Sequence, residues 1–238
     1  MKSKTLRISA SLALILAIAI ATQWWLRHDR HTYLGGATAA FVATFADPPT
    51  PESEVTRREL DELLDLQWTR TESDVEAARE DRKTDIRRFY AALGFNPGSK
   101  PELPLLRSLA ARVEDDFKPY VRDAKQRFRR LRPYEIESQL DPCIGDVRGD
   151  LSYPSGHATF AYVMAYLLID MLPERSAQLL ARADEFAKQR MVCGVHFRSD
   201  IEAGRAGARW LAQRFLSNSS YREDAARAAA ELRAALPK

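Results

Sequence analysis

One long apolar segment constrains the fold of this chain more than any other feature of its sequence. Residues 157–172 are apolar almost without interruption, and Pro173 follows them directly. A helix that is hydrophobic on all sides has no face for water, so it has to be buried among other elements. The segment is too short, and too closely followed by proline, to be read as a membrane span. It therefore predicts a central helix inside a globular domain.

The chain from residue 52 onward also follows helical periodicity, and no convincing alternating strand pattern appears. Leu60, Leu63, Leu64 and Trp68 are expected on one helix face, and Pro119 is expected to begin a new helix. The other expected helices run over about 74–93, 106–118, 174–192, 199–215 and 221–236. The chain has 238 residues, enough for one sizeable core. The predicted fold class is all-α, a single-domain helical bundle.

The first residues carry the pattern of an export signal. A basic start, Lys2 to Arg7, precedes residues 8–21, an unbroken run of apolar and small residues with two serines. A basic region followed by a short apolar region is typical of a secretory signal, here with a small-x-small cleavage site that ends at Ala21. The alternative is an uncleaved N-terminal membrane anchor over residues 8–26, barely long enough to span a bilayer. Either reading exports the globular part, and a periplasmic location is expected.

Charge and proline content indicate which partners and which domain boundaries to expect. The net charge of +3 is accounted for by the basic N-terminus, and the other charges are interleaved, so the sequence shows no sign of a nucleic-acid partner. Proline density at residues 47–51 argues against regular structure there. We expect residues 1–21 to be a signal peptide or anchor, 22–51 a leader or linker, and 52–238 the folded domain.

Three separated segments carry residues suited to holding and attacking a phosphoryl group. Charge on a phosphoryl group is spread over three oxygens, so its transfer depends on positioning and on cationic stabilisation. Arg supplies a planar fork for two oxygens, and Lys supplies a point charge. The segments contain Lys125, Arg132 and Pro133; Pro154, Ser155, Gly156 and His157; and Arg190, His196 and Asp200.

The second and third segments each suggest a local geometry. Ser155 and Gly156 stand directly before the apolar helix, where backbone N–H groups at a helix start form a natural anion seat. His196 and Asp200 stand four residues apart, a spacing that brings side chains together on a helical turn. A carboxylate that holds one ring nitrogen leaves the other free to attack phosphorus. One of the two histidines, His157 or His196, could then be the nucleophile and the other the proton donor.

These residues resemble the PAP2 superfamily, whose pattern is Lys-x6-Arg-Pro, then Pro-Ser-Gly-His, then Ser-Arg-x5-His-x3-Asp. Every position matches except one, because Gln189 stands where the pattern has serine. Within the superfamily the chain looks like the class A bacterial nonspecific acid phosphatases, from about Asp47 to the C-terminus. The residues that carry this closer resemblance are the Arg-Pro-Tyr, Ser-Tyr-Pro-Ser-Gly-His-Ala-Thr, Cys-Gly-Val-His and Ser-Asp-Ile-Glu-Ala-Gly-Arg segments.

The resemblance implies an exported acid phosphatase that hydrolyses phosphate monoesters through a phosphohistidine. It implies that His196 is the nucleophile, that Asp200 orients it, and that His157 is the general acid and base. The phosphate-binding residues it implies are Lys125, Arg132, Ser155, Gly156 and Arg190. No metal and no other cofactor is expected, because three protein cations take the part that metal ions play in other phosphatases. The expected partners are small phosphorylated substrates, with a homo-oligomer as a further option.

Other functions stay open at this point. A lipid phosphate or pyrophosphate phosphatase of the same superfamily is one, although integral versions need several spanning helices and this chain offers at most one. A vanadium-dependent haloperoxidase would use the same pocket to hold vanadate, but such chains are typically much longer. A non-enzymatic anion-binding protein is the remaining class, and the His196–Asp200 pair beside His157 argues against it.

Cys143 and Cys193 are the two cysteines of the chain. They could be buried thiols, but in an oxidising compartment a disulfide is favoured. It would join the loop before His157 to the segment before His196 and so fix two predicted catalytic segments relative to each other. Two cysteines alone make a poor zinc site.

Overall fold

The computed structural model describes residues 32–96, 98, 101–144 and 150–237. The signal peptide or anchor predicted over residues 1–21, and part of the predicted leader, lie outside these residues. Tyr33–Lys238 forms one compact unit, and its regular elements in the described residues are all helical, as the sequence predicts. The elements are α2 Thr38–Val42, α3 Glu54–Thr69, α4 Glu72–Glu80, η1 Ile86–Phe89, α5 Tyr90–Leu93, α6 Pro104–Phe128, α7 Pro133–Ile136, α8 Gly156–Met171, η2 Pro173–Arg175, α9 Ser176–Val192, α10 Arg198–Ser217 and α11 Ser219–Ala235.

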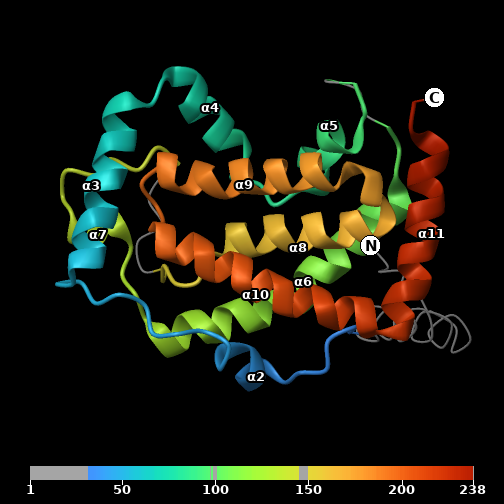
Figure 1. Cartoon of the computed structure of the whole chain (residues 1–238), viewed down its shortest axis with the longest axis horizontal. Helices are drawn as coiled ribbons and strands as arrows, with labels where there is room; N and C mark the ends of the chain where they lie inside the picture. The colour runs from blue at the N-terminus through green and yellow to red at the C-terminus, as the bar shows by residue number, and fades with distance from the viewer. Residues whose placement is uncertain (1–31, 97, 99–100, 145–149, 238) are drawn as a thin grey trace, which may run out of the picture. The chain divides into compact units, whose positions relative to one another are not determined.

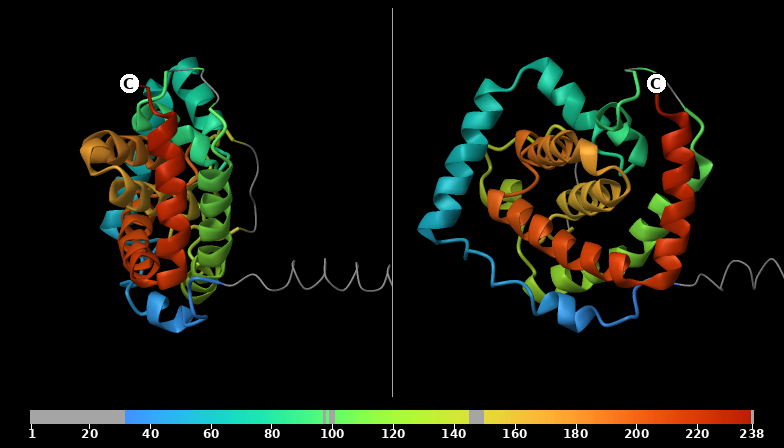
Figure 2. Two further views of the ribbon diagram at one scale, coloured as in Figure 1. Left: turned by 90° about the vertical axis from the view of Figure 1, so that its right-hand side faces the viewer. Right: turned by 45° about the vertical axis from the view of Figure 1, so that its right-hand side comes forward.

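Helix α8 is the central element, which confirms the prediction from its apolar sequence. It contacts α6, α9, α10 and α11, and buried side chains occur on all its faces, from Ala158 to Met171. Figure 1 shows α8, α9 and α10 running side by side. In the right-hand view of Figure 2, α8 and α9 lie inside a ring of other helices that includes α3, α4, α10 and α11. None of the helices in the described part of the chain is long and apolar enough to cross a membrane.

Helix α6 is continuous, and the predicted break at Pro119 is wrong. Pro119 lies inside the helix, which runs on for more than two turns and carries Lys125 in its last turn. A proline inside a helix removes one backbone hydrogen bond and costs about 3 kcal/mol. The buried face offsets this cost because it continues past the proline, with Phe117 before it and Tyr120 and Val121 after it.

The segment predicted as a leader contributes to the core from Tyr33 onward. Tyr33, Leu34 and Phe41 are buried, and α2 packs against α6 and α10. Gly207 on α10 makes room for this contact, since a Cβ there would meet the Phe41 and Phe45 rings at 2.9 and 2.8 Å. Aromatic residues upstream of the prolines therefore bury enough surface to order this segment. The compact unit begins at Tyr33 rather than at residue 52.

The helix predicted over 74–93 is divided into α4, η1 and α5. Thr71 and Asp74 form a capping box at its start, as its sequence suggests, and Gly94 ends it at φ 103°. The interruption follows Asp81, a buried carboxylate that accepts from Arg88 at 2.8 Å and from Arg182 at 2.5 Å. Both arginines lie outside α4, in η1 and α9, and helical periodicity alone does not reveal these pairings.

Helix α3 forms where expected, but Trp68, predicted on the same face as Leu63, is exposed. Leu63 is buried, whereas Trp68 is 78% exposed. Each residue advances about 100° around a helix, so Trp68 lies roughly 140° from Leu63. It therefore faces away from the core. The remaining helices, α9 to α11, begin and end within a few residues of the predicted ranges.

Candidate active site

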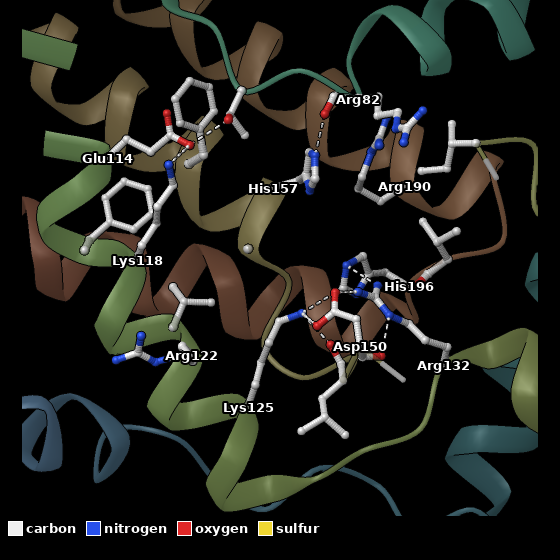
Figure 3. A pocket seen from close by; sticks show the side chains of 18 of the residues that line it. Arg82, Glu114, Lys118, Arg122, Lys125, Arg132, Asp150, His157, Arg190 and His196 are labelled. Atoms are coloured by element: carbon white, nitrogen blue, oxygen red, sulfur yellow. Dashed lines mark hydrogen bonds and ion pairs between the residues drawn. The ribbon is translucent and has the colours of Figure 1, made fainter. Parts of the chain in front are cut away.

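A cavity of about 450 Å³ opens beside the N-terminus of α8. The three sequence segments meet there. Figure 3 shows Lys125, Asp150, Arg132 and His196 gathered in one part of the cavity, with His157 and Arg190 in another. Six of the predicted site residues line it, namely Lys125, Arg132, Gly156, His157, Arg190 and His196. Ser155 and Asp200, which are fully buried, do not line the cavity.

Lys125 and Arg132 hold a carboxylate between them. Lys125 Nζ lies 3.2 and 3.3 Å from the two carboxylate oxygens of Asp150 and also donates to the Leu151 carbonyl. Arg132 Nη2 lies 2.5 Å from Asp150 Oδ2. Burial, and then the nearby Arg132 charge, lower the pKa of Lys125 to about 8. The pair can therefore bind two oxygens of one anion, and Asp150 is a site residue that the sequence analysis did not select.

Ser155 caps α8 and links it to α10. Its Oγ accepts from the Ala158 N–H at 3.3 Å, and its own N–H donates to the Asp200 carbonyl at 3.0 Å. Gly204 on α10 permits this approach, because a Cβ there would lie 2.8 Å from the Ser155 carbonyl oxygen. The contact fixes the start of α8, and with it Gly156, relative to the helix that carries Asp200.

His157 donates a hydrogen bond to the backbone. Its Nε2 lies 2.9 Å from the Arg82 carbonyl oxygen, and a carbonyl only accepts, so Nε2 carries a proton. The ring stacks against Phe186 with centroids 6.3 Å apart. Burial, and then the Arg190 charge, lower the pKa of His157 to about 4. An anion bound beside the ring would act in the opposite direction and favour the imidazolium.

The ring of His196 has a defined tautomer. Arg132 Nη1 lies 2.7 Å from Nε2, and a guanidinium only donates, so Nε2 is the unprotonated, accepting nitrogen. Nδ1 then carries the proton and donates to Asp200 Oδ2 at 3.2 Å. Burial and the nearby Arg132 charge hold the pKa of His196 well below its usual value. The geometry gives a ring nitrogen with a free lone pair whenever Arg132 turns to another acceptor.

Asp200 is fully buried and accepts hydrogen bonds at both oxygens. Oδ2 accepts from the Phe197 N–H at 2.9 Å and from the Ser152 hydroxyl, and Oδ1 accepts from Arg130 Nη1 at 2.8 Å. Burial raises the pKa of this carboxyl, and Arg130 opposes that rise. Ser152 and Arg130 therefore belong to the site, although the sequence analysis passed over both.

Arg190 lies in the last turn of α9, with part of its guanidinium unsatisfied. It is 1% exposed, and Nη2 donates to the Ala78 carbonyl at 2.6 Å. Nε and Nη1 find no hydrogen-bond partner among the residues that the structure places. Burial lowers the pKa of Arg190 to about 10. A buried cation with spare donors at the cavity wall is suited to receive an anion. Gln189, which stands in place of the motif serine, is also buried. Its Oε1 has no hydrogen-bond partner among the described residues.

Cys143 and Cys193 form a disulfide. Cys193 directly follows α9 and packs in a small cluster with Ala78, Ile144 and Val195. The bond therefore holds the end of α9, which carries Arg190, against the loop that leads toward α8. Across the described residues, no group of three or more His, Cys, Asp and Glu side chains is arranged to hold a metal ion.

Comparison with known proteins identifies a family for this part of the chain. The profile of the PAP2 superfamily matches residues 117–222. These residues form a PAP2 superfamily domain. The PAP2 domain contains all three motif segments and the disulfide residues, from Lys125 to Asp200.

Relatives of the PAP2 domain include bacterial acid phosphatases. The chain is 33% identical over 118 residues to a protein named acid phosphatase from Zymomonas mobilis, covering 48% of this chain and 43% of that protein. It is 28% identical over 139 residues to a non-specific acid phosphatase of Providencia stuartii, covering 57% and 56%. It is 38% identical over 85 residues to one of Salmonella typhi, covering 34% of each. The matches thus span between about a third and just over half of these relatives.

The fold around the PAP2 domain also resembles a solved structure. That structure is a transmembrane PAP2 type phosphatidylglycerolphosphate phosphatase from Bacillus subtilis, with a TM-score of 0.50 and 18% identity. The similarity covers 74% of this chain and 89% of the other. At this identity the likeness supports the helical fold and carries no information about substrate.

Proposed function

We propose that this protein is an exported acid phosphatase that hydrolyses phosphate monoesters through a phosphohistidine on His196, without a metal ion. One observation carries the proposal. The unprotonated Nε2 of His196 lies at a cavity that Lys125, Arg132 and Arg190 also line. A nucleophile beside three cations is the arrangement that phosphoryl transfer requires.

In the first step, Nε2 of His196 attacks phosphorus, the bond from phosphorus to the ester oxygen breaks, and that oxygen takes a proton from His157. Asp200 accepts a hydrogen bond from Nδ1–H throughout and so keeps the ring oriented. Lys125, Arg132 and Arg190 bind the phosphoryl oxygens, together with the N–H group of Gly156, whereas the Ser155 N–H is already bonded to the Asp200 carbonyl. The Asp150 carboxylate between Lys125 and Arg132 supports this role, because it occupies an oxygen-binding position.

In the second step, His157 removes a proton from water, the water oxygen attacks phosphorus, and the bond from phosphorus to His196 breaks. Inorganic phosphate leaves and both histidines return to their starting states. A His157 with a pKa of about 4 is protonated in free enzyme only under acid conditions, and a phosphate dianion beside it extends that range upward. An optimum on the acid side of neutrality follows.

The relatives named acid phosphatase support the reaction class. The export part of the proposal rests on the basic and apolar pattern of residues 1–21. A mature N-terminus near Thr22 in the periplasmic fraction is the expected result for a signal peptide. Full-length protein in the membrane fraction would favour the anchor, and intact Met1 on membrane-free secreted protein would exclude cleavage.

A substrate panel tests the reaction class. The panel contains p-nitrophenyl phosphate, an alkyl phosphate and phosphatidate in mixed micelles, each assayed at acid and neutral pH with and without EDTA. We expect hydrolysis of the soluble monoesters, unchanged by EDTA and absent in His196→Ala. Loss of activity in EDTA would refute metal independence. Selective hydrolysis of phosphatidate would point instead to a lipid phosphatase.

A further inference from the structure

Arg130 lies beneath the proposed site, hidden from solvent. It belongs to the same basic run as Lys125 and Arg132, but its side chain is only 5% exposed. Its guanidinium carbon lies 3.9 Å from the centre of the Phe197 ring. Burying an arginine is costly unless the charge is paired, so this position calls for a specific counter-charge.

Two carboxylates supply that counter-charge from opposite sides. Arg130 Nη1 lies 2.8 Å from Asp200 Oδ1, and Nη2 lies 3.0 Å from Glu59 Oε2. Glu59 is itself fixed, because it accepts from the Ser199 N–H at 2.6 Å and from the Ser199 hydroxyl at 2.9 Å. Glu59 on α3 therefore holds Arg130 in one orientation, with Nη1 directed at the carboxylate that bonds His196.

The charge state of Asp200 decides which nitrogen of His196 can attack. An ionised Asp200 only accepts, so it draws the ring proton to Nδ1 and leaves Nε2 with its lone pair. A neutral Asp200 could donate to Nδ1 instead, and the ring proton would move to Nε2, where it blocks attack. Because burial favours the neutral carboxyl, a neighbouring cation has to offset that preference.

We propose that Arg130, anchored by Glu59, is a positioning residue that keeps Asp200 ionised and thereby holds His196 in the nucleophilic tautomer. This inference rests on the proposed function of His196. Arg130 touches neither the cavity nor the reacting atoms, and its action passes through Asp200. It extends the His196–Asp200 pair to a chain of four residues that ends at Glu59.

Several other charged or titratable groups surround these four residues and affect how the ionisation of Asp200 and His196 depends on pH. The charged groups around His196 mainly lower its pKa. This effect does not by itself favour the ionised form of Asp200. Tyr153 adds a phenol near Asp200. By element they are Lys125 on α6, Arg132 before α7, Tyr153 before α8, His157 on α8 and Arg190 on α9. Within the described residues, Arg130 is the cation that pairs directly with Asp200.

The test compares Arg130→Gln, which removes the charge but keeps a donor, with Arg130→Lys, which keeps the charge. Arg127→Gln removes an exposed cation from the same run and is the matched control. The readout is kcat/KM against pH with p-nitrophenyl phosphate, which reports ionisations of the free enzyme. In Arg130→Gln we expect the acid limb to move to higher pH by about 1–3 units, the usual effect of an opposite charge at this range. In Arg130→Lys the acid limb should lie close to its wild-type pH, and in Arg127→Gln its position should be unchanged.

A uniform loss of activity at every pH in Arg130→Gln, with no shift of the limb, would show a merely structural role and overturn the inference. A second measurement needs no activity and no variant of Arg130. In wild-type protein with ¹⁵N-labelled histidine, the His196 signals, assigned by their loss in His196→Gln, should show Nδ1 protonated and Nε2 unprotonated from pH 5 to 8. A proton on Nε2 in that range would also overturn it. If the wild type cleaves no phosphate ester, the proposed function fails, and the ¹⁵N result still decides the charge state of Asp200.

Discussion

Lys125 and Asp150 form an ion pair inside the cavity, with Nζ 3.2 Å from Oδ1. The same carboxylate accepts from Arg132. Burial disfavours its charge, but Lys125 and Arg132 outweigh this effect and lower the pKa of Asp150. Two cations that we propose bind phosphate are thus partly neutralised by a side chain of the protein. A phosphate oxygen that binds both cations has to compete with Asp150.

Replacing Asp150 by Asn should therefore tighten binding of inorganic phosphate. The Asp150 side chain is 54% exposed, so its ion pair is worth at most about 1 kcal/mol, which corresponds to roughly fivefold in affinity. The inhibition constant of phosphate against p-nitrophenyl phosphate measures the change. Asp141→Asn, which removes an exposed carboxylate of the same loop away from the cavity, is the control. Weaker phosphate binding in Asp150→Asn would show that this carboxylate assists binding instead.

Arg190 should be more valuable for activity than for stability. Its buried guanidinium has unsatisfied donors, and its pKa is lowered to about 10 by burial, so the folded state bears a cost for keeping it charged. In Arg190→Met we expect activity to fall by about 100-fold or more. Thermal stability without phosphate should be unchanged or higher, and phosphate should raise the melting temperature of the wild type much more than that of the variant. A large loss of stability in phosphate-free buffer would contradict this account.

Stability should decline on the acid side in a way that depends on His157. Its pKa is about 4 in the folded protein against an ordinary value of 6.5. Between these values the unfolded chain binds the extra proton, so the free energy of unfolding falls as pH drops from 6.5 to 4. One such proton gives a slope of about 1.4 kcal/mol per pH unit. Urea unfolding across this range should show a shallower slope for His157→Gln, and parallel curves for the two proteins would count against the assigned shift.

Reduction of the disulfide should lower the stability of the whole domain. Cys143 and Cys193 are 50 residues apart, and closing a loop of that length is worth about 4 kcal/mol in the chain-entropy model. Thermal unfolding with and without reductant measures the loss, with the Cys143→Ser, Cys193→Ser double variant as a control that reductant should not affect. Two free thiols in native protein purified in air would contradict the bond.

The sequence predicted those parts of the fold that depend on composition and local pattern. The apolar run of α8 requires burial whatever surrounds it, and Thr71, Asp74 and Gly94 act on their own helix ends. It failed where distant residues decide the outcome. Pro119 stays in α6 because buried side chains continue on both sides, and α4 ends just before Asp81, which pairs with the distant Arg88 and Arg182.

The same distinction holds for the site. Motif spacing selected six of the residues that line the cavity, but it gave no reason to prefer Arg130 over its exposed neighbours Arg127 and Arg129. Arg130 is distinguished only by Glu59, which lies 71 positions away in the chain. Asp150 looks like an ordinary loop acid until the fold brings it between Lys125 and Arg132. Contacts between distant segments supply this information, and one sequence does not contain it in readable form.

The division of labour between the two histidines is the centre of this account. His196→Ala removes the attacking atom, so no phosphoenzyme should form with any substrate. His157→Ala keeps the nucleophile but lacks the group that activates water. Because p-nitrophenolate leaves without needing a proton, the first step should survive in part, while the second should slow by about 10²–10⁴-fold.

Rapid-quench measurement of the p-nitrophenol burst, with acid-labile phosphate counted on the protein, tests this most directly. The account predicts a burst close to one per site and retained phosphate for His157→Ala, and neither for His196→Ala. With an alkyl phosphate, whose leaving oxygen does need a proton, the His157→Ala burst should disappear. A burst from His196→Ala, or labelled phosphate on any other residue, would contradict the assignment of His196 as the nucleophile.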